Sequence, residues 1–176
     1  LAGTIVGIVG EDKVINGAGI EKGDVLLGFK SSGLHTNGYS LARKVLFSEY
    51  DVNDHVEELG CTVAEELLQV HRSYLGLISE LKEMDGVNGF SHITGGGLLE
   101  NIPRVLPEHL AAKLDANSWH MPKIFQWLQD QGNIESSEMH RVLNCGVGMV
   151  VVVPKEGSEA AINKLNELGE VAWVIG

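Results

Sequence analysis

The chain has 176 residues, of which 44% are hydrophobic and 21% charged, a composition typical of globular domains that excludes a disordered or fibrous chain. Its 13 basic and 24 acidic side chains give a formal net charge of −11, which disfavours non-specific binding to nucleic acid or to an anionic membrane surface. A chain of this length can bury a core without disulfides, and we expect one domain over residues 1–176.

The most apolar run, residues 146–153, is far shorter than the roughly 20 residues of a membrane-spanning helix, and no basic and apolar leader opens the sequence. Cys61 and Cys145 lie far apart and have no metal-ligand spacing, which argues against a zinc site and a disulfide framework. We therefore expect two buried thiols in a cytoplasmic protein.

The first part of the chain predicts a hairpin and a buried strand. Residues 4–9 are β-branched and predict a strand that turns and returns at residues 14–15. Residues 24–30 are almost unbroken in apolar character, which predicts a strand buried on both faces. The polar loop of residues 31–38 then leads into a helix at residues 41–46.

The middle of the chain repeats the order of strand, glycine loop and helix. Apolar residues between 63 and 81 keep one helical face for about five turns and predict a long, bent helix. Residues 90–93 predict an extended segment, which a glycine loop at 94–97 connects to a short helix at 98–102. Residues 110–114 predict another strand.

The last part predicts helices at residues 124–131, 136–139 and 158–168 and strands at residues 149–153 and 171–175. Strands and helices therefore interleave along the chain, and the expected hairpin adds an antiparallel pair. This order predicts an α+β fold, a mixed β-sheet with helices packed on it.

The two glycine loops are the strongest indication of a binding site. Each stands between a strand and a helix, where backbone N–H groups can face a phosphate. His35 lies in the first loop and His92 just before the second, where an imidazole could donate to a phosphoryl oxygen or move a proton. Turn geometry alone would also explain the glycines, and structural hydrogen bonds the histidines. The residues alone predict a phosphorylated-ligand site between two glycine loops.

Other sequence patterns exclude several classes of nucleotide-binding protein and hydrolase. The sequence holds no Walker-A or dinucleotide fingerprint and no G-x-S-x-G or H-E-x-x-H motif, and we assign no metal ligand. Arg104 could donate a pair of hydrogen bonds to a phosphate or form a surface ion pair. The remaining histidines are interpreted as structural or exposed: His55, His71, His109, His120 and His140.

Several segments together resemble, in order and spacing, the phosphoribosylformylglycinamidine cyclo-ligases, also called aminoimidazole ribonucleotide synthetases. The segments are GDV at residues 23–25, SSGLHTNGYSLARK at 31–44, HITGGG at 92–97, ENIPRVLP at 100–107, FQWLQ at 125–129 and NCGVGM at 144–149. The resemblance runs over the whole chain but covers only the C-terminal half of such an enzyme. It implies the C-terminal domain type of that superfamily, with the N-terminal ATP-binding and dimerisation domain absent from this chain.

The resemblance also implies a function. It implies a purine-biosynthesis ligase that uses ATP and Mg²⁺ to cyclise formylglycinamidine ribonucleotide, works as a homodimer in the cytoplasm and is inactive without its N-terminal domain. It implies that His35 and His92 are catalytic. The substrate- and phosphate-binding residues that it implies are Ser31, Ser32, Gly33, Asn37, Gly95, Gly96, Gly97, Asn101 and Arg104.

The sequence departs from the family pattern at Leu34 and Thr36, where the family favours proline and serine, and at Val70 and His71, where it has proline and threonine. Without that proline we expect the preceding helix to continue, and we leave His71 outside the site. Two alternative functions stay open at this point: a related ATP-dependent enzyme with another acceptor, and a non-catalytic module that binds a phosphorylated ligand.

Overall fold

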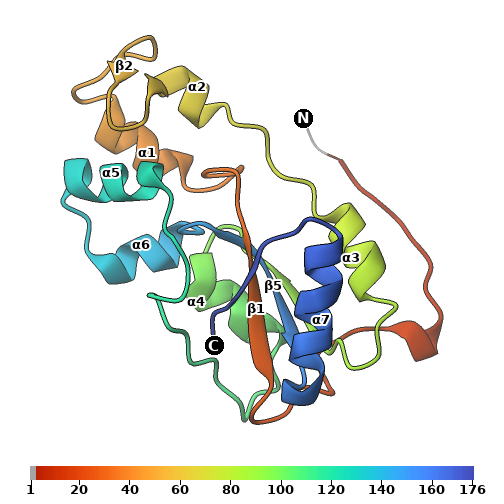
Figure 1. Cartoon of the computed structure of the whole chain (residues 1–176). Helices are drawn as coiled ribbons and strands as arrows, with labels where there is room; N and C mark the ends of the chain where they lie inside the picture. Colours follow the sequence, from red (N-terminus) through yellow and green to blue (C-terminus); the bar gives the residue numbers. More distant parts are fainter. Residues whose placement is uncertain (1–2) are drawn as a thin grey trace.

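A four-stranded sheet forms the centre of the protein in the computed structural model, which describes residues 3–176. Its strands are β1 (Val25–Lys30), β4 (Gly89–His92), β5 (Val147–Val153) and β6 (Ala172–Val174). They lie in the order β4-β5-β1-β6, and each neighbouring pair is antiparallel. Figure 1 shows the two central strands, β1 and β5. A separate two-stranded sheet pairs β2 (His55–Val56) with β3 (Cys61–Thr62).

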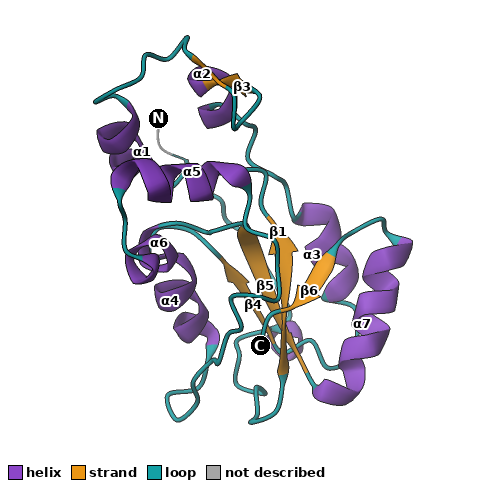
Figure 2. Ribbon diagram, turned by 60° about the vertical axis from the view of Figure 1, so that its left-hand side comes forward, coloured by secondary structure: helices purple, strands orange, loops and turns teal. Residues whose placement is uncertain are grey.

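Both faces of the four-stranded sheet are covered, so all seven residues of β5 are buried. Alternate residues of a strand point to opposite faces. Val151 packs on one face with Leu27 of β1, beneath helices α3 (Leu75–Leu81) and α7 (Lys155–Glu167). Val150 packs on the other face, beneath α4 (Gly97–Asn101) and the 3-10 helix η2 (Ile102–Val105). Figure 2 shows the sheet between these two layers.

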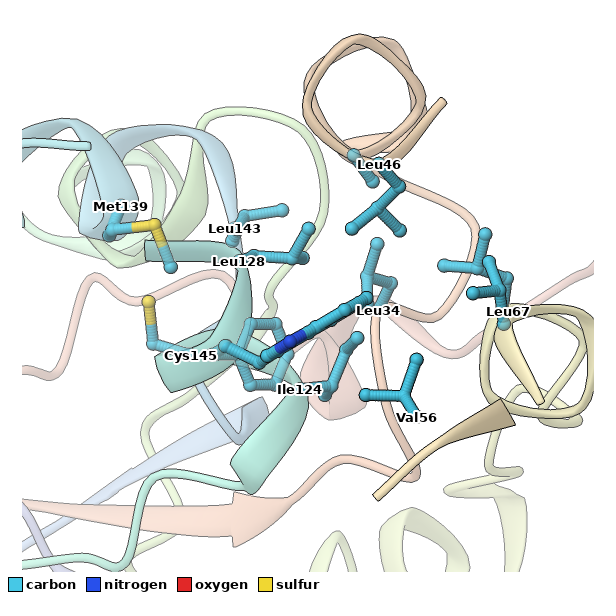
Figure 3. Close-up of a cluster of buried hydrophobic side chains, with 13 residues drawn as sticks. Leu34, Leu46, Val56, Leu67, Ile124, Leu128, Met139, Leu143 and Cys145 are labelled. Carbon is cyan, nitrogen blue, oxygen red and sulfur yellow. The ribbon is translucent and has the colours of Figure 1, made fainter. Parts of the chain in front are cut away.

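A third apolar cluster lies beyond one end of the sheet. It is built by α1 (Tyr39–Leu46), α2 (Val63–Leu67), α5 (Lys123–Gly132) and α6 (Ser136–Val142). In Figure 3, Leu46 and Leu67 point toward Leu34, which comes from the loop after β1. Cys145, from the turn before β5, belongs to the same cluster. The cluster therefore anchors two segments that connect to the central strands.

The α+β class and the packing of helices on a sheet are confirmed. The strands expected at residues 24–30, 90–93, 149–153 and 171–175 form, as do the helices expected at residues 41–46, 98–102, 124–131, 136–139 and 158–168. The sheet itself differs from the expected mixed one, because every strand pair in the described residues is antiparallel. No helix in residues 3–176 has the length and apolar character needed to cross a membrane.

The hairpin predicted at the start of the chain is wrong. Residues 4–9 form no strand and run outside the sheet, as the red segment of Figure 1 shows. Ile5 and Ile8 are 99% and 103% exposed. β-Branched residues favour an extended backbone, but a strand also needs a partner, and residues 14–15 do not pair with this segment. Residues 110–114 are likewise irregular rather than a strand.

The long helix predicted between residues 63 and 81 is also wrong, because α2 ends at Leu67 and α3 begins at Leu75. The hydroxyl of Tyr39 donates to the carbonyl oxygen of Leu67, an acceptor that a continuing helix would use. Val70, which the helical pattern placed on the apolar face, is 84% exposed. The chain leaves the helix here even without a proline.

The two cysteines differ in burial. Cys145 is buried, as expected, and burial raises the pKa of its thiol to about 12. Cys61 is only partly buried, which corrects the expectation for that residue. Both thiols are free.

The substitution Leu27→Ala tests how much the stability of the fold depends on the central strands. It is fully buried in β1, so Leu27→Ala should lower the free energy of unfolding by about 2–5 kcal/mol, through lost transfer energy and the cavity left behind. Urea denaturation measures this change. Leu99→Ala is the matched control, because Leu99 is 51% exposed and its truncation should cost about 0.5 kcal/mol or less. Equal losses in the two variants would contradict the observed packing.

Candidate functional site

The two glycine loops meet at one end of the sheet because of the strand directions. β1 and β4 both run antiparallel to β5, so both end beside its beginning. Lys30, the last residue of β1, pairs with Val147, and His92, the last residue of β4, pairs with Met149. The loops that follow β1 and β4 therefore start as close neighbours.

A buried asparagine in the turn before β5 fixes the first loop. The side-chain amide of Asn144 donates to the carbonyl oxygens of Gly33 at 2.9 Å and Leu34 at 3.3 Å. Its Oδ1 accepts from the Ser31 hydroxyl at 2.8 Å and from the N–H of Gly146 at 2.9 Å. These bonds satisfy a buried amide and tie the loop to the beginning of β5.

Three histidines from three segments lie together beside this loop. The ring of His35 stacks on that of His71. The ring centroids are 3.9 Å apart, and the angle between the ring planes is 17°. Nε2 of His71 lies 3.3 Å from Nε2 of His92. Each histidine has one ring nitrogen that lies within 4.8 Å of a ring nitrogen of both other histidines. We call these residues the histidine cluster; it extends from a buried imidazole, His35, to an exposed one, His92.

The surroundings keep two of these imidazoles neutral. Burial lowers the pKa of His35 to about 4, with further contributions from His71, His92 and Arg72. Burial, and then His71, also lowers the pKa of His92. The N–H of Ser32 donates to Nε2 of His35 at 3.0 Å, which places the proton of the neutral ring on Nδ1. That buried Nδ1 has no hydrogen-bond partner in the described residues.

The segment between α2 and α3 brings His71 to the cluster. The Ser32 hydroxyl donates to the carbonyl oxygen of Val70 at 2.6 Å, which holds the segment against the first loop. On the other side of His71, the Tyr74 hydroxyl donates to the carbonyl oxygen of Lys30 at 2.8 Å. His71 is therefore held between two attachments to the end of β1 and its loop.

A glycine in β5 makes room for this arrangement. A Cβ on Gly148 would lie 2.6 Å from Cε1 of His35 and would overlap the Tyr74 hydroxyl. His35 itself has a φ of 60°, a left-handed conformation that non-glycine residues seldom adopt and that costs energy. The fold accepts this strain while it holds the imidazole against β5.

Asn101 supports the second loop as Asn144 supports the first. Its Nδ2 donates to the carbonyl oxygen of Gly97 at 2.8 Å and lies 3.3 Å from those of Thr94 and Gly95. Its Oδ1 accepts from the Thr94 hydroxyl at 3.2 Å. The side chain is buried and its hydrogen bonds lie within the loop, so it fixes the conformation of the loop.

The loops offer fewer unused backbone donors than the sequence predicts. The N–H groups of Ser31, Ser32 and Gly97 donate within the protein, at 2.8, 3.0 and 3.0 Å. Among the six predicted residues Ser31, Ser32, Gly33, Gly95, Gly96 and Gly97, those whose N–H groups form no hydrogen bond in the described part of the chain are Gly33, Gly95 and Gly96. Three of the six predicted donors, all of them glycine amides, are therefore available to a phosphate.

Of two further residues of the predicted site, Asn37 lies at the loops and Arg104 lies on η2. Oδ1 of Asn37 lies 3.6 Å from the position that a Cβ would take on Gly95, so Asn37 stands where the two loops meet. Arg104 is exposed on η2. Within residues 3–176 no hydrogen bond or ion pair links Arg104 to the loops or to the histidine cluster.

His71 is the site residue that the sequence pattern did not indicate. The pattern predicts it within a helix and outside the site, whereas the end of α2 at Leu67 leaves it in an irregular segment between His35 and His92. Its only sequence signal is the departure from the family pattern at this position.

Residues 21–176 match the model of a protein family described as "AIR synthase related protein, C-terminal domain". The chain belongs to this family. The matched range includes both glycine loops, the three members of the histidine cluster, Asn101 and Asn144. The expected family is confirmed, and with it the assignment to a C-terminal domain type.

Curated relatives of this AIR synthase related domain are named phosphoribosylformylglycinamidine cyclo-ligase. The protein of that name from Pseudothermotoga lettingae is 47% identical over 176 residues, and that from Citrifermentans bemidjiense is 50% identical over 178 residues. Each alignment covers 100% of this chain but 52% and 51% of the relative, so the chain spans about half the length of the curated relatives it matches.

A solved structure shows a similar fold. Thiamine-monophosphate kinase from Stenotrophomonas maltophilia superposes with a TM-score of 0.63, over 96% of this chain and 51% of that one. The two sequences are 14% identical, so the similarity concerns the fold alone.

Asn144→Ala should destabilise the domain. The substitution leaves the buried carbonyl oxygens of Gly33 and Leu34 and the Ser31 hydroxyl without a partner, which should lower the free energy of unfolding by about 1–3 kcal/mol. Urea denaturation measures the loss. Asn117→Ala is the control, because Asn117 is exposed and bonds only to neighbouring Asp115. A loss no larger than that of the control would contradict the role of Asn144.

The stability of the domain should fall as the pH is lowered from 6.5 to about 4. Within this window unfolded His35, with its ordinary pKa of 6.5, binds a proton that the folded protein excludes. The stabilisation is complete above pH 6.5 and is lost toward the folded pKa; His92 contributes with the same sign.

Urea denaturation across this pH range tests the assignment. His35→Asn should flatten the pH dependence, since asparagine tolerates the left-handed backbone and does not titrate. His109→Asn, at an exposed position, should keep the wild-type slope. An unchanged slope in His35→Asn would show that His35 is not the group responsible.

Proposed function

We propose that this domain is the C-terminal half of a phosphoribosylformylglycinamidine cyclo-ligase of purine biosynthesis. The observation that carries the proposal is the identity of 47–50%, over the full chain, to relatives of that name. In the proposed reaction ATP phosphorylates the formamide oxygen of formylglycinamidine ribonucleotide. The amidine nitrogen then attacks the same carbon and phosphate leaves, which closes the imidazole ring and yields aminoimidazole ribonucleotide, ADP and phosphate.

The chemistry explains why this site would suit the reaction. An amide oxygen is a poor leaving group until it is phosphorylated, and the negative charge on the phosphoryl oxygens then needs donors already in position. We assign this role to the unused N–H groups of Gly33, Gly95 and Gly96. Asn37, between the loops, is assigned to orient the substrate, because its amide both donates and accepts.

The two histidines of the glycine motifs take different roles in this proposal. His35 is buried and neutral, and its unpartnered Nδ1–H donates to the substrate amide or to a phosphoryl oxygen. His92 is exposed and neutral, so it can accept the proton that the amidine nitrogen loses and return it to water. The burial difference between the two rings supports this division.

ATP and Mg²⁺ belong to the proposed reaction of the whole enzyme. Mg²⁺ prefers carboxylate, phosphate and water oxygens. The polar partners of the histidine cluster are a backbone N–H, a hydroxyl and the imidazoles themselves, which do not fit Mg²⁺. We therefore assign no residue of this chain to Mg²⁺ and place its ligands in the N-terminal domain.

We propose that an N-terminal domain covers part of this one in a homodimeric cytoplasmic enzyme. The length of the relatives supports the proposal, since this chain spans about half of each. The extended segment near the start of the chain supports it as well. Its apolar side chains are 60–103% exposed, an unfavourable contact with water that a covering domain would remove: Ile5, Val6, Ile8 and Val9.

Isothermal titration of the 176-residue chain tests where the substrate binds. We expect saturable binding of formylglycinamidine ribonucleotide, weaker binding of ribose 5-phosphate, and weaker substrate binding in His35→Ala. His120→Ala, an exposed histidine outside both loops, is the control and should bind as wild type. Equal affinity for the two ribose phosphates would contradict a substrate-specific site in this half.

The catalytic assignment is tested in the chain joined to its N-terminal domain. His35→Ala and His92→Ala should each lower kcat/KM by about 100-fold or more, the range of a lost proton-transfer group. Wild-type kcat/KM in both variants would show that the two histidines do not act in the reaction. The isolated domain should show no turnover, and normal activity without the N-terminal half would overturn the proposed division of the enzyme.

A further inference from the structure

We propose that His35, His71 and His92 form a binding site for a divalent transition-metal ion, with Zn²⁺ as its representative. The three imidazoles come from the loop after β1, the segment between α2 and α3, and the end of β4. The site would exist whether or not the proposed reaction is correct, because it depends only on how these three segments meet.

The spacing of the two outer nitrogens matches that of ligands on one ion. Nε2 of His71 and Nε2 of His92 are 3.3 Å apart. Two nitrogens bound to a tetrahedral zinc at about 2.0–2.1 Å are about 3.3–3.4 Å from each other. The distance between these two nitrogens therefore fits two ligands of one ion.

His35 provides the third ligand after a limited movement. The nitrogens of the cluster lie up to 4.8 Å apart, and the rings of His35 and His71 are stacked, so one ring must turn to direct both lone pairs at the same point. The turn gives up the hydrogen bond from the N–H of Ser32 to His35. The ligand atom is then Nε2, which carries the lone pair of the neutral ring.

The surroundings of His71 and His92 allow the Nε2 atom of each ring to carry a free lone pair. Oγ1 of Thr36 lies 3.3 Å from Nδ1 of His71. When that Nδ1–H donates to the hydroxyl, Nε2 of His71 presents its lone pair toward His92, the type of outer contact that orients metal-bound histidines. His92 is exposed, so exchange with water can move its proton to Nδ1 and free its Nε2.

The donor set selects the class of ion. Three neutral imidazoles suit Zn²⁺, Ni²⁺, Co²⁺ and Cu²⁺, whereas Mg²⁺ and Ca²⁺ require oxygen ligands. The exposed side of His92 leaves room for water as a fourth ligand, as in zinc sites with three protein ligands. The site therefore favours a transition-metal ion over Mg²⁺ or Ca²⁺.

Titration calorimetry of the chelator-treated 176-residue chain with Zn²⁺ tests the proposal. We expect one Zn²⁺ per chain, and binding at least about tenfold weaker in His71→Gln, since loss of even an outer partner of a metal ligand typically costs 10–100-fold. His109→Gln, at an exposed position outside the cluster, should bind as wild type. Mg²⁺ should not compete.

Three further measurements keep the result unambiguous. Circular dichroism should show the wild-type fold in His71→Gln, and His92→Gln should weaken Zn²⁺ binding independently. NMR of the imidazole nitrogens should show that Zn²⁺ shifts the signals of His35, His71 and His92 first. The absence of saturable binding, equal affinity in His71→Gln and wild type, or an equal loss in His109→Gln would overturn the proposal. None of these outcomes depends on catalysis, so they leave the proposed function to its own tests.

Discussion

The requirement that a buried amide use all its hydrogen-bonding groups organises the functional end of this protein. Asn144 meets it with partners in the turn before β5 and in the loop after β1. That connection places Leu34 in the apolar cluster of the helices and His35 against β5. A loop that contains glycine would otherwise have many conformations, and the buried bonds of Asn144 exclude most of them.

Desolvation then determines the chemistry available to the histidine cluster. A buried imidazole loses the hydration that stabilises its charged form, and two further imidazoles beside it make a second charge still less favourable. The cluster therefore offers neutral donors and lone pairs rather than positive charge. The proposed substrate and the proposed metal ion would use the same imidazole nitrogens, so the two would compete for them.

The fold of this domain is shared beyond close sequence similarity. The similarity in fold to a thiamine-monophosphate kinase persists at 14% identity, so the antiparallel sheet and its helices do not depend on the residues of one active site. In the proposed function, the chemistry lies in the loops at the beginning of β5 and in the neighbouring segments. His71 illustrates this point, because one side chain in an irregular segment changes the donor set of the site.

Local sequence determined the α+β class, most strands and helices, and the two glycine loops with His35 and His92, because these depend on apolar periodicity and turn residues. It could not determine whether residues 4–9 pair, since a strand needs a partner edge. Nor could it show that Tyr39 takes the carbonyl oxygen of Leu67 and releases His71 from a helix. Contacts between segments distant in the sequence decided these features, because hydrogen bonds and burial there outweigh local propensity.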